Sequence, residues 1–80
     1  MNEVDLDIPV ADVLDNQPEL LDLLVNIGFK PLANPIMRQS VGKVVSLRRG
    51  AKMIGIPMTQ LVKELIWNGY IVKGADVDAE

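Results

Sequence analysis

Three glycines, each followed at once by a bulky apolar or aromatic residue, divide this sequence into short segments. They occur in Ile27-Gly28-Phe29, Ile54-Gly55-Ile56 and Asn68-Gly69-Tyr70. Glycine ends a helix readily because it adopts the left-handed backbone conformation, and an apolar residue after it can fold back on the last helical turn. We therefore expect each glycine to terminate a helix, so that the chain consists of short helices joined by tight corners.

The clearest pair of helices lies in residues 46–70. Ser46 is a good N-cap because its hydroxyl can accept a hydrogen bond from a free amide of the first turn. Pro57 has no amide hydrogen and a fixed φ, so it suits the first turn of the second helix. The apolar stripes predicted for the two helices are Leu47, Ala51 and Ile54, then Leu61, Leu65 and Ile66. The tight Gly-Ile-Pro corner predicts that the two helices cross steeply.

Three more helices are predicted ahead of that pair. Their expected spans are residues 7–15, 16–27 and 34–44, with residues 30–33 as a loop. Asp7 and Asn34 are the predicted caps of the first and third helices, since each precedes a proline that suits a first turn. Asn16 or Gln17 is expected to begin the second helix.

The N-terminal residues alternate in a different way. Val4, Leu6 and Ile8 are separated by acidic residues, which is typical of a short strand or an extended arm. We predict a single all-α domain over residues 1–74, with about five short helices in an orthogonal array. A short N-terminal strand can pair with residues 70–73, and residues 75–80 are expected to form a frayed tail.

The composition removes most catalytic chemistry. The sequence has no cysteine and no histidine, so it lacks a thiolate nucleophile, a cysteine metal site and the usual general base near neutral pH. A Ser–Lys pair, such as Ser40 with Lys43, is the remaining option and would need burial to lower the lysine pKa. We therefore expect a protein that is not an enzyme and that has no cofactor.

The location of the protein is predicted from what the sequence lacks. No apolar run approaches the roughly 20 residues that a helix needs to span a bilayer, so no membrane association is predicted. The chain also does not open with a basic segment followed by an apolar one, as a secretory signal does. A cytoplasmic location is the resulting expectation.

Charge is strongly segregated along the chain. Residues 1–22 contain acidic side chains and no Lys or Arg, residues 23–63 contain basic side chains and no Asp or Glu, and the net charge is −3. The two parts can face each other within one molecule, or they can steer the association of two copies. The acidic residues of the predicted helices are Asp12, Asp15, Glu19 and Asp22. They lack the glycine-turned loop of calcium sites, so we expect them on outer helix faces and predict no metal site.

Two sets of residues are candidates for contact with a ligand or partner. Lys43, Arg48, Arg49 and Lys52 can form an anion site or a partner contact near the start of a helix. A solvated helix face is the simpler interpretation of these charges. Met58 and Trp67 are candidate interface residues, although a lone Trp near the end of an apolar helix usually lies in the core or half-buried. An exposed apolar patch in such a short aliphatic chain would favour dimerisation.

The function that these features favour is a non-catalytic protein-interaction or ligand-sensing module. Its predicted partner is a second copy, in a homodimer, or another protein. The alternative is a helix-turn-helix that binds nucleic acid through residues 46–69. In that case the second helix would present Met58, Thr59, Gln60, Lys63 and Glu64 to the major groove. A single Lys beside a Glu disfavours this alternative, since binding needs several phosphate contacts.

The chain also resembles a known family of small helical domains of uncharacterised function. The residues that carry the resemblance are Val13-Leu14, Pro18-Glu19, Leu24 to Gly28-Phe29, Asn34-Pro35, Ser46-Leu47, Ala51, Gly55-Ile56, Leu61 and Leu65. Members of that family occur alone or ahead of hemerythrin-like and PAS-type sensor domains. The resemblance covers about residues 4–70 and implies the helical fold, because these positions are caps and core residues.

A related branch is the redox-disulfide domain associated with hybrid cluster proteins, and the N-terminal domain of iron–sulfur cluster repair proteins is similar too. Those relatives carry cysteines in the loop after the Gly-Phe position, whereas this chain has Lys30-Pro31-Leu32-Ala33-Asn34 there. No functional residue is carried over by the resemblance. It adds one more alternative, which is an accessory domain linked to redox or nitrosative-stress sensing.

Overall fold

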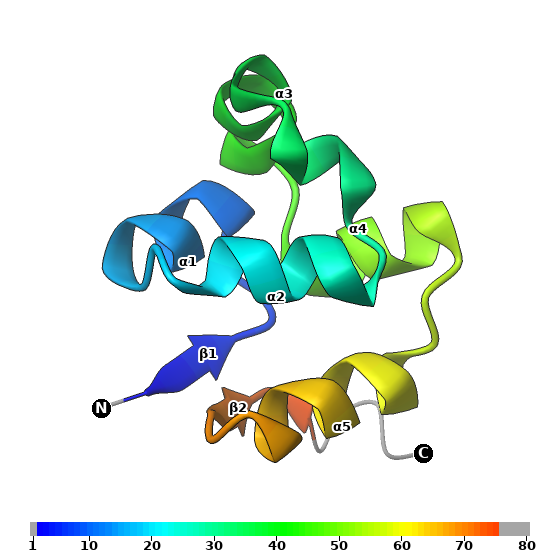
Figure 1. Cartoon of the computed structure of the whole chain (residues 1–80). Helices are drawn as coiled ribbons and strands as arrows, with labels where there is room; N and C mark the ends of the chain where they lie inside the picture. The colour runs from blue at the N-terminus through cyan, green and yellow to red at the C-terminus, as the bar shows by residue number, and fades with distance from the viewer. Residues whose placement is uncertain (1, 76–80) are drawn as a thin grey trace.

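The computed structural model describes residues 2–75 and has a mostly helical fold with one small sheet (Figure 1). The elements follow the order β1 (Glu3–Asp5), α1 (Val10–Asn16), α2 (Leu20–Ile27), η1 (Lys30–Ala33), α3 (Pro35–Ser40), η2 (Val41–Lys43), α4 (Leu47–Ile54), α5 (Met58–Trp67) and β2 (Ile71–Lys73), where η marks a 3₁₀ helix. The predicted all-α domain with a short N-terminal strand is therefore confirmed. Residues 76–80 of the predicted tail lie outside the described residues.

The helices lie across one another, with α2 at the centre of the molecule (Figure 1). Figure 1 shows α2 across the middle of the molecule beside α1, with α3 at one end and α5 with the two strands at the other. The 3₁₀ helices connect these parts: η1 packs on α2 and α3, and η2 packs on α1. None of the described helices is long and apolar enough to cross a bilayer.

The sheet joins the two ends of the described chain. β1 and β2 are parallel, with Glu3 opposite Ile71 and Asp5 opposite Lys73. The amide of Leu6 donates to the carbonyl of Lys73 at 3.1 Å, which extends the pairing beyond β1. On the other side of β1, the Gln17 side-chain amide donates to the carbonyl of Glu3 at 2.6 Å. Gln17 therefore ties the start of α2 to the strand.

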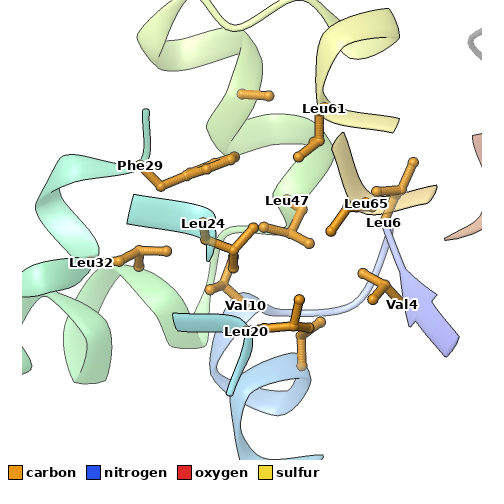
Figure 2. Packing of buried hydrophobic residues seen from close by; sticks show 12 residues of the cluster. Val4, Leu6, Val10, Leu20, Leu24, Phe29, Leu32, Leu47, Leu61 and Leu65 are labelled. Atoms are coloured by element: carbon orange, nitrogen blue, oxygen red, sulfur yellow. The ribbon is translucent and has the colours of Figure 1, made fainter. Parts of the chain in front are cut away.

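The core is aliphatic, as the composition predicted, with one aromatic ring (Figure 2). Its buried side chains are Val4, Leu6, Val10, Val13, Leu20, Leu24, Phe29, Leu32, Leu47, Ala51, Leu61 and Leu65. The predicted stripe positions Leu47 and Leu61 are fully buried, as are Ala51 and Leu65. The outer members of the two stripes were predicted wrongly.

Ile54 and Ile66 are 42% and 58% exposed. Ile54 is the last residue of α4, beyond the turn that Ala51 packs into the core. Ile66 directly follows the buried Leu65, and consecutive helical residues point about 100° apart, so only one of the two can face the interior.

The glycines end helices as predicted. Gly55 lies in the left-handed region with φ 82°, and the amide of Ile56 donates to the carbonyl of Ala51 at 2.8 Å. This is the backward bond that fastens an apolar residue to the last helical turn. Gly69, with φ 92°, ends α5 in the same way, because the amide of Tyr70 reaches the carbonyl of Leu65 at 3.0 Å.

Two of the predicted caps are confirmed. The Ser46 hydroxyl accepts a hydrogen bond from the amide of Arg49 at 3.2 Å. The Asn34 side chain accepts one from the amide of Ile36 at 2.9 Å. Pro57, expected inside the first turn of α5, instead occupies the N-cap position with an extended backbone.

The N-terminal helix boundaries differ from the predictions. α1 is preceded by Pro9 as its N-cap residue, and within the described part of the chain no side chain caps it. Asp7, the predicted cap, binds Arg48 instead, because that guanidinium offers a stronger partner than a single amide. α2 begins at Leu20, after Gln17 has turned inward to β1.

The middle of the chain is also more finely divided than predicted. Residues 30–33, expected to be a loop, form the 3₁₀ helix η1. The helix expected to run to about Val44 ends at Ser40 and continues as η2. Gly42 of η2 is buried against Ala11, so the chain must tighten there to bring its backbone close to α1.

Candidate functional site

A surface pocket with a wholly apolar lining lies between α4 and the elements η1, α3 and η2. Its volume is about 190 Å³. It is lined by Val10, Phe29, Pro31, Leu32, Met37, Val41, Gly42, Val45, Gly50, Met53 and Ile54. We call these residues the apolar pocket. Val10 and Phe29 belong to the buried core, so the pocket opens directly onto the hydrophobic interior of the domain.

The rim of the apolar pocket carries exposed side chains. Met37 and Val41 face it from α3 and η2, and Met53 and Ile54 face it from the last turn of α4. All of these side chains are exposed, and Met53 is 67% exposed. Methionine is flexible and polarisable, so it adapts to differently shaped partners. A concave apolar surface with methionine side chains on its rim is suited to receiving an apolar group.

The predicted cationic cluster is divided by the structure. Arg48 is directed toward the N-terminal arm, where its Nε lies 2.7 Å from Oδ1 of Asp7 and its Nη2 donates to the carbonyl of Gly74 at 2.8 Å. The hydrogen bond from Arg48 lowers the pKa of Asp7, and the same bond raises the pKa of Arg48. This contact joins the acidic and basic parts of the chain within one molecule.

The other cations of the cluster lie in two separate hollows. Arg49 and Lys52 line a shallow depression of about 570 Å³ together with Ser46, Met53 and part of Arg48. Lys43 lies in a different depression, of about 600 Å³, formed where α1, α3 and η2 meet. The structure therefore brings Arg49 and Lys52 together with Arg48 but does not bring Lys43 to them.

The depression that holds Lys43 also contains Arg38, which sequence reasoning missed. Asp15 lines it too, and the Nε atom of Arg38 is buried without a hydrogen-bond partner among the described residues. Gln17 has a second such atom, its Oε1. Arg38 gave no signal in the sequence because it is a single basic residue in a short helix, with its neighbours supplied by α1.

The two candidate interface residues have different environments. Met58 is half-buried and packs against the core, so it is a structural residue of α5. Trp67 is 81% exposed at the C-terminal end of the same helix. Ile66 and Ile71, which are near it in sequence, are also exposed. We call Ile66, Trp67 and Ile71 the α5 patch.

The hydroxyl groups of Ser40 and Tyr70 have different environments in the structure. The Ser40 hydroxyl donates to the carbonyl of Ile36 at 2.9 Å, so it is occupied with its own helix rather than with Lys43. Burial raises the pKa of the Tyr70 hydroxyl, and nearby Glu19 raises it further. Among residues 2–75 no group of three His, Cys, Asp or Glu side chains is placed to hold a metal ion.

Comparison with known proteins connects the chain to one family and one solved structure. The family described as "Domain of unknown function (DUF1858)" matches residues 4–62. The chain is also similar to the conserved domain protein from Streptococcus pneumoniae TIGR4, whose crystal structure has a TM-score of 0.89 and 54% sequence identity, over 92% of this chain and 94% of that one. A comparison with curated proteins gave no match. The family match covers most of the chain, so this protein belongs to the DUF1858 family.

Proposed function

We propose that this domain is a non-catalytic protein-interaction module that self-associates through the α5 patch. The observation that carries the proposal is the exposure of Trp67, the only Trp of the sequence, which is 81% exposed. Trp has a large apolar surface, and leaving it in water is costly. Trp is also among the residues most enriched at the energetic centre of protein interfaces.

The surroundings of the α5 patch suit a second copy of the same chain. Lys63 and Glu64 precede it on α5, and Lys73, whose Nζ lies 3.8 Å from Oδ2 of Asp5, follows it on β2. A patch bordered by both signs of charge can pair opposite charges when two copies meet around a two-fold axis. Most soluble oligomers are symmetric homodimers of this kind. The apolar residues would then form the dry centre and the charges the rim.

The single Trp supplies a direct test. Sedimentation velocity over a dilution series should show dimers that dissociate into monomers. The Trp67 fluorescence should move to longer wavelength over the same dilutions, because the indole ring returns to water. Trp67→Ser should weaken the dimer about tenfold or more, as expected for an aromatic interface anchor.

Met53→Ser is the matched control, because it removes another exposed apolar side chain on a different surface. It should leave the dimer unchanged. A wild-type protein that stays monomeric at every concentration, or a Trp67→Ser variant that dimerises normally, would overturn the proposal.

Nucleic-acid binding by α4 and α5 is less well supported. The exposed face of α5 offers Thr59, Gln60 and Lys63 beside a Glu64 carboxylate, and Arg48 of α4 is already bound to Asp7. Duplex binding needs several phosphate contacts, which this face does not provide. A gel-shift on random duplex DNA at low salt tests this alternative, and clear retardation would favour it.

A link to redox or nitrosative-stress sensing rests on the resemblance to the hybrid-cluster and repair-protein branches. In this chain the corresponding loop is η1, which has no cysteine and contributes Pro31 and Leu32 to the apolar pocket. Any role of this kind would therefore depend on binding another protein rather than on thiol chemistry of the domain.

A further inference from the structure

We propose that the apolar pocket is a docking site for an acidic amphipathic segment of another protein. An apolar side chain of that segment would enter the pocket, and its flanking carboxylates would meet the cations around it. This inference concerns a surface and a partner different from those of the self-association proposed above, and the two can fail separately.

The pocket is built at some cost to the helix that lines it. Gly50 lies in the middle of α4 and does not have a positive φ, so the backbone conformation does not require glycine there. A Cβ at this position would lie 3.3 Å from Cε1 of Phe29 and 3.5 Å from Cγ1 of Val45. Glycine weakens a helix interior relative to alanine, and here its missing side chain lets Phe29 and Val45 pack directly against the backbone of α4. These packed groups form part of the wall of the pocket.

The charges around the pocket select the partner. The pocket is lined mainly by η1, α3, η2 and α4, which contain no Asp or Glu, and by Val10 of α1, a helix that also carries Asp12 and Asp15. Met53 lines both the pocket and the depression that holds Arg48, Arg49 and Lys52, whereas Arg38 and Lys43 line another depression together with Asp15. Apart from Arg48, which binds Asp7, these cations form no ion pair within residues 2–75. Opposite potentials favour encounter and orientation, so an acidic segment is the complementary partner.

A second copy of this chain does not have the required combination. Its acidic residues are concentrated in residues 1–22, and Glu64, which lies near the exposed Ile66 and Trp67, directly follows Lys63. The large exposed hydrophobic residues of the described chain all lie between Ile36 and Ile71. The acidic part of another copy would therefore bring the carboxylates without an exposed apolar side chain to fill the pocket. A different protein, with apolar anchors and carboxylates on one segment, satisfies both requirements.

The experiment uses two synthetic amphipathic peptides with the same leucine anchors at i, i+3, i+4 and i+7. One has glutamate at the flanking positions and the other has lysine. Each is titrated into the full chain labelled with ¹⁵N, at low and at high salt. The glutamate peptide should give saturable shifts at the amides of Leu32, Val41 and Ile54, and binding should weaken as salt screens the charges. The lysine peptide should bind at least about tenfold more weakly.

Two substitutions of equal charge separate docking from a general electrostatic effect. Met53→Glu places a carboxylate on the rim of the pocket and should weaken the glutamate peptide about tenfold. Thr59→Glu adds the same charge to the exposed face of α5 and should change the affinity less than about twofold, because the site is separate. Circular dichroism verifies that both variants remain folded.

Several results would overturn the proposal. Equal affinity for the two peptides would remove the charge selection, and shifts confined to α5 would place docking at the other surface. If the amide shifts of Leu32 and Val41 grow with protein concentration in the absence of peptide, the occupant of the pocket is a second copy of the chain. Absence of binding to the glutamate peptide would reject the site outright, and would leave dimerisation through the α5 patch unaffected.

Discussion

α4 and the segment formed by α3 and η2 contain similar kinds of residues and have opposite roles. Both begin with a side-chain cap, both contain basic residues, and both are rich in aliphatic side chains. α4 places Leu47 and Ala51 fully inside the core. None of the described residues of α3 is buried, and η2 buries only Gly42. The number of apolar residues therefore does not by itself decide whether a short helix contributes side chains to the core.

The difference lies in what the apolar face of each segment meets. Leu47 and Ala51 are four residues apart and share one helix face, which α4 turns toward the leucines of α2 and α5 (Figure 2). Met37 and Val41 are also four residues apart, but they line the apolar pocket at the surface, where both side chains are exposed. α4 thus stabilises the fold, whereas the other segment supplies apolar surface to the solvent.

The largest effect should come from the core face of α4. Leu47→Ala removes a fully buried side chain and leaves a cavity, which costs about 2–5 kcal/mol of the free energy of unfolding. That is a large fraction of the stability of so small a domain. Urea unfolding followed by circular dichroism measures it. A loss below about 1 kcal/mol would mean that the core repacks around α4 and would weaken the contrast with α3.

The two helix caps give a sharper comparison, because they remove the same kind of hydrogen bond. Ser46→Ala should lower the free energy of unfolding by about 1 kcal/mol. Asn34→Ala should lower it by less, since none of the described residues of α3 is buried. Native-state hydrogen exchange should instead show faster local exchange in α3. Equal global losses for the two variants would show that α3 unfolds together with the core.

The basic residues of the two segments also differ in whether they form an ion pair. Arg48 of α4 lowers the pKa of Asp7 below its ordinary value of 3.8. The stabilisation from this pair is therefore complete above that value and is lost as the pH falls through the lower pKa of the folded state. Because the Asp7 side chain is 56% exposed, Asp7→Asn should cost only about 0.2–1 kcal/mol at neutral pH.

The same variant should flatten the pH dependence of the free energy of unfolding below about pH 4. Arg38→Gln in α3 is the matched variant, since among the described residues Arg38 forms no ion pair. It should leave that pH dependence as in the wild type. An unchanged acid profile for Asp7→Asn would show that the pair contributes nothing to stability.

The smallest effect is expected on the exposed side of the middle segment. Val44 is 78% exposed just after η2, so Val44→Ser should change the free energy of unfolding by no more than about 0.5 kcal/mol. Thermal unfolding measures this directly. A loss above about 1 kcal/mol would mean that the segment contributes to the core after all.

Local signals in the sequence were sufficient for the helix ends and much of the core. Ser46, Asn34 and Gly55 act on amides or carbonyls within a few residues, so their roles are visible in a short stretch of sequence. The burial of Leu47 and Leu61 follows from helical periodicity in the same way. The small sheet was also predictable, because the alternation around Val4 is a local pattern.

Roles that depend on distant partners could not be predicted. Asp7 was assigned as a cap because Pro9 follows it, but its partner Arg48 is 41 residues away in sequence. Gln17 was assigned to a helix start, and its side chain binds the carbonyl of Glu3 instead. The apolar pocket arises only when η1 and η2 are placed against α4, so no single stretch predicts it.

The parallel pairing of β1 with β2 has a consequence for how the chain is made. β1 can be paired only after residue 73 has been synthesised, because its partner β2 is the last described strand. Until then Val4 and Leu6 have no completed interior to enter, although both are fully buried in the finished domain. Nascent chains stalled before Ile71 should therefore remain open to proteases at their N-terminus, and the domain should close late and in one step.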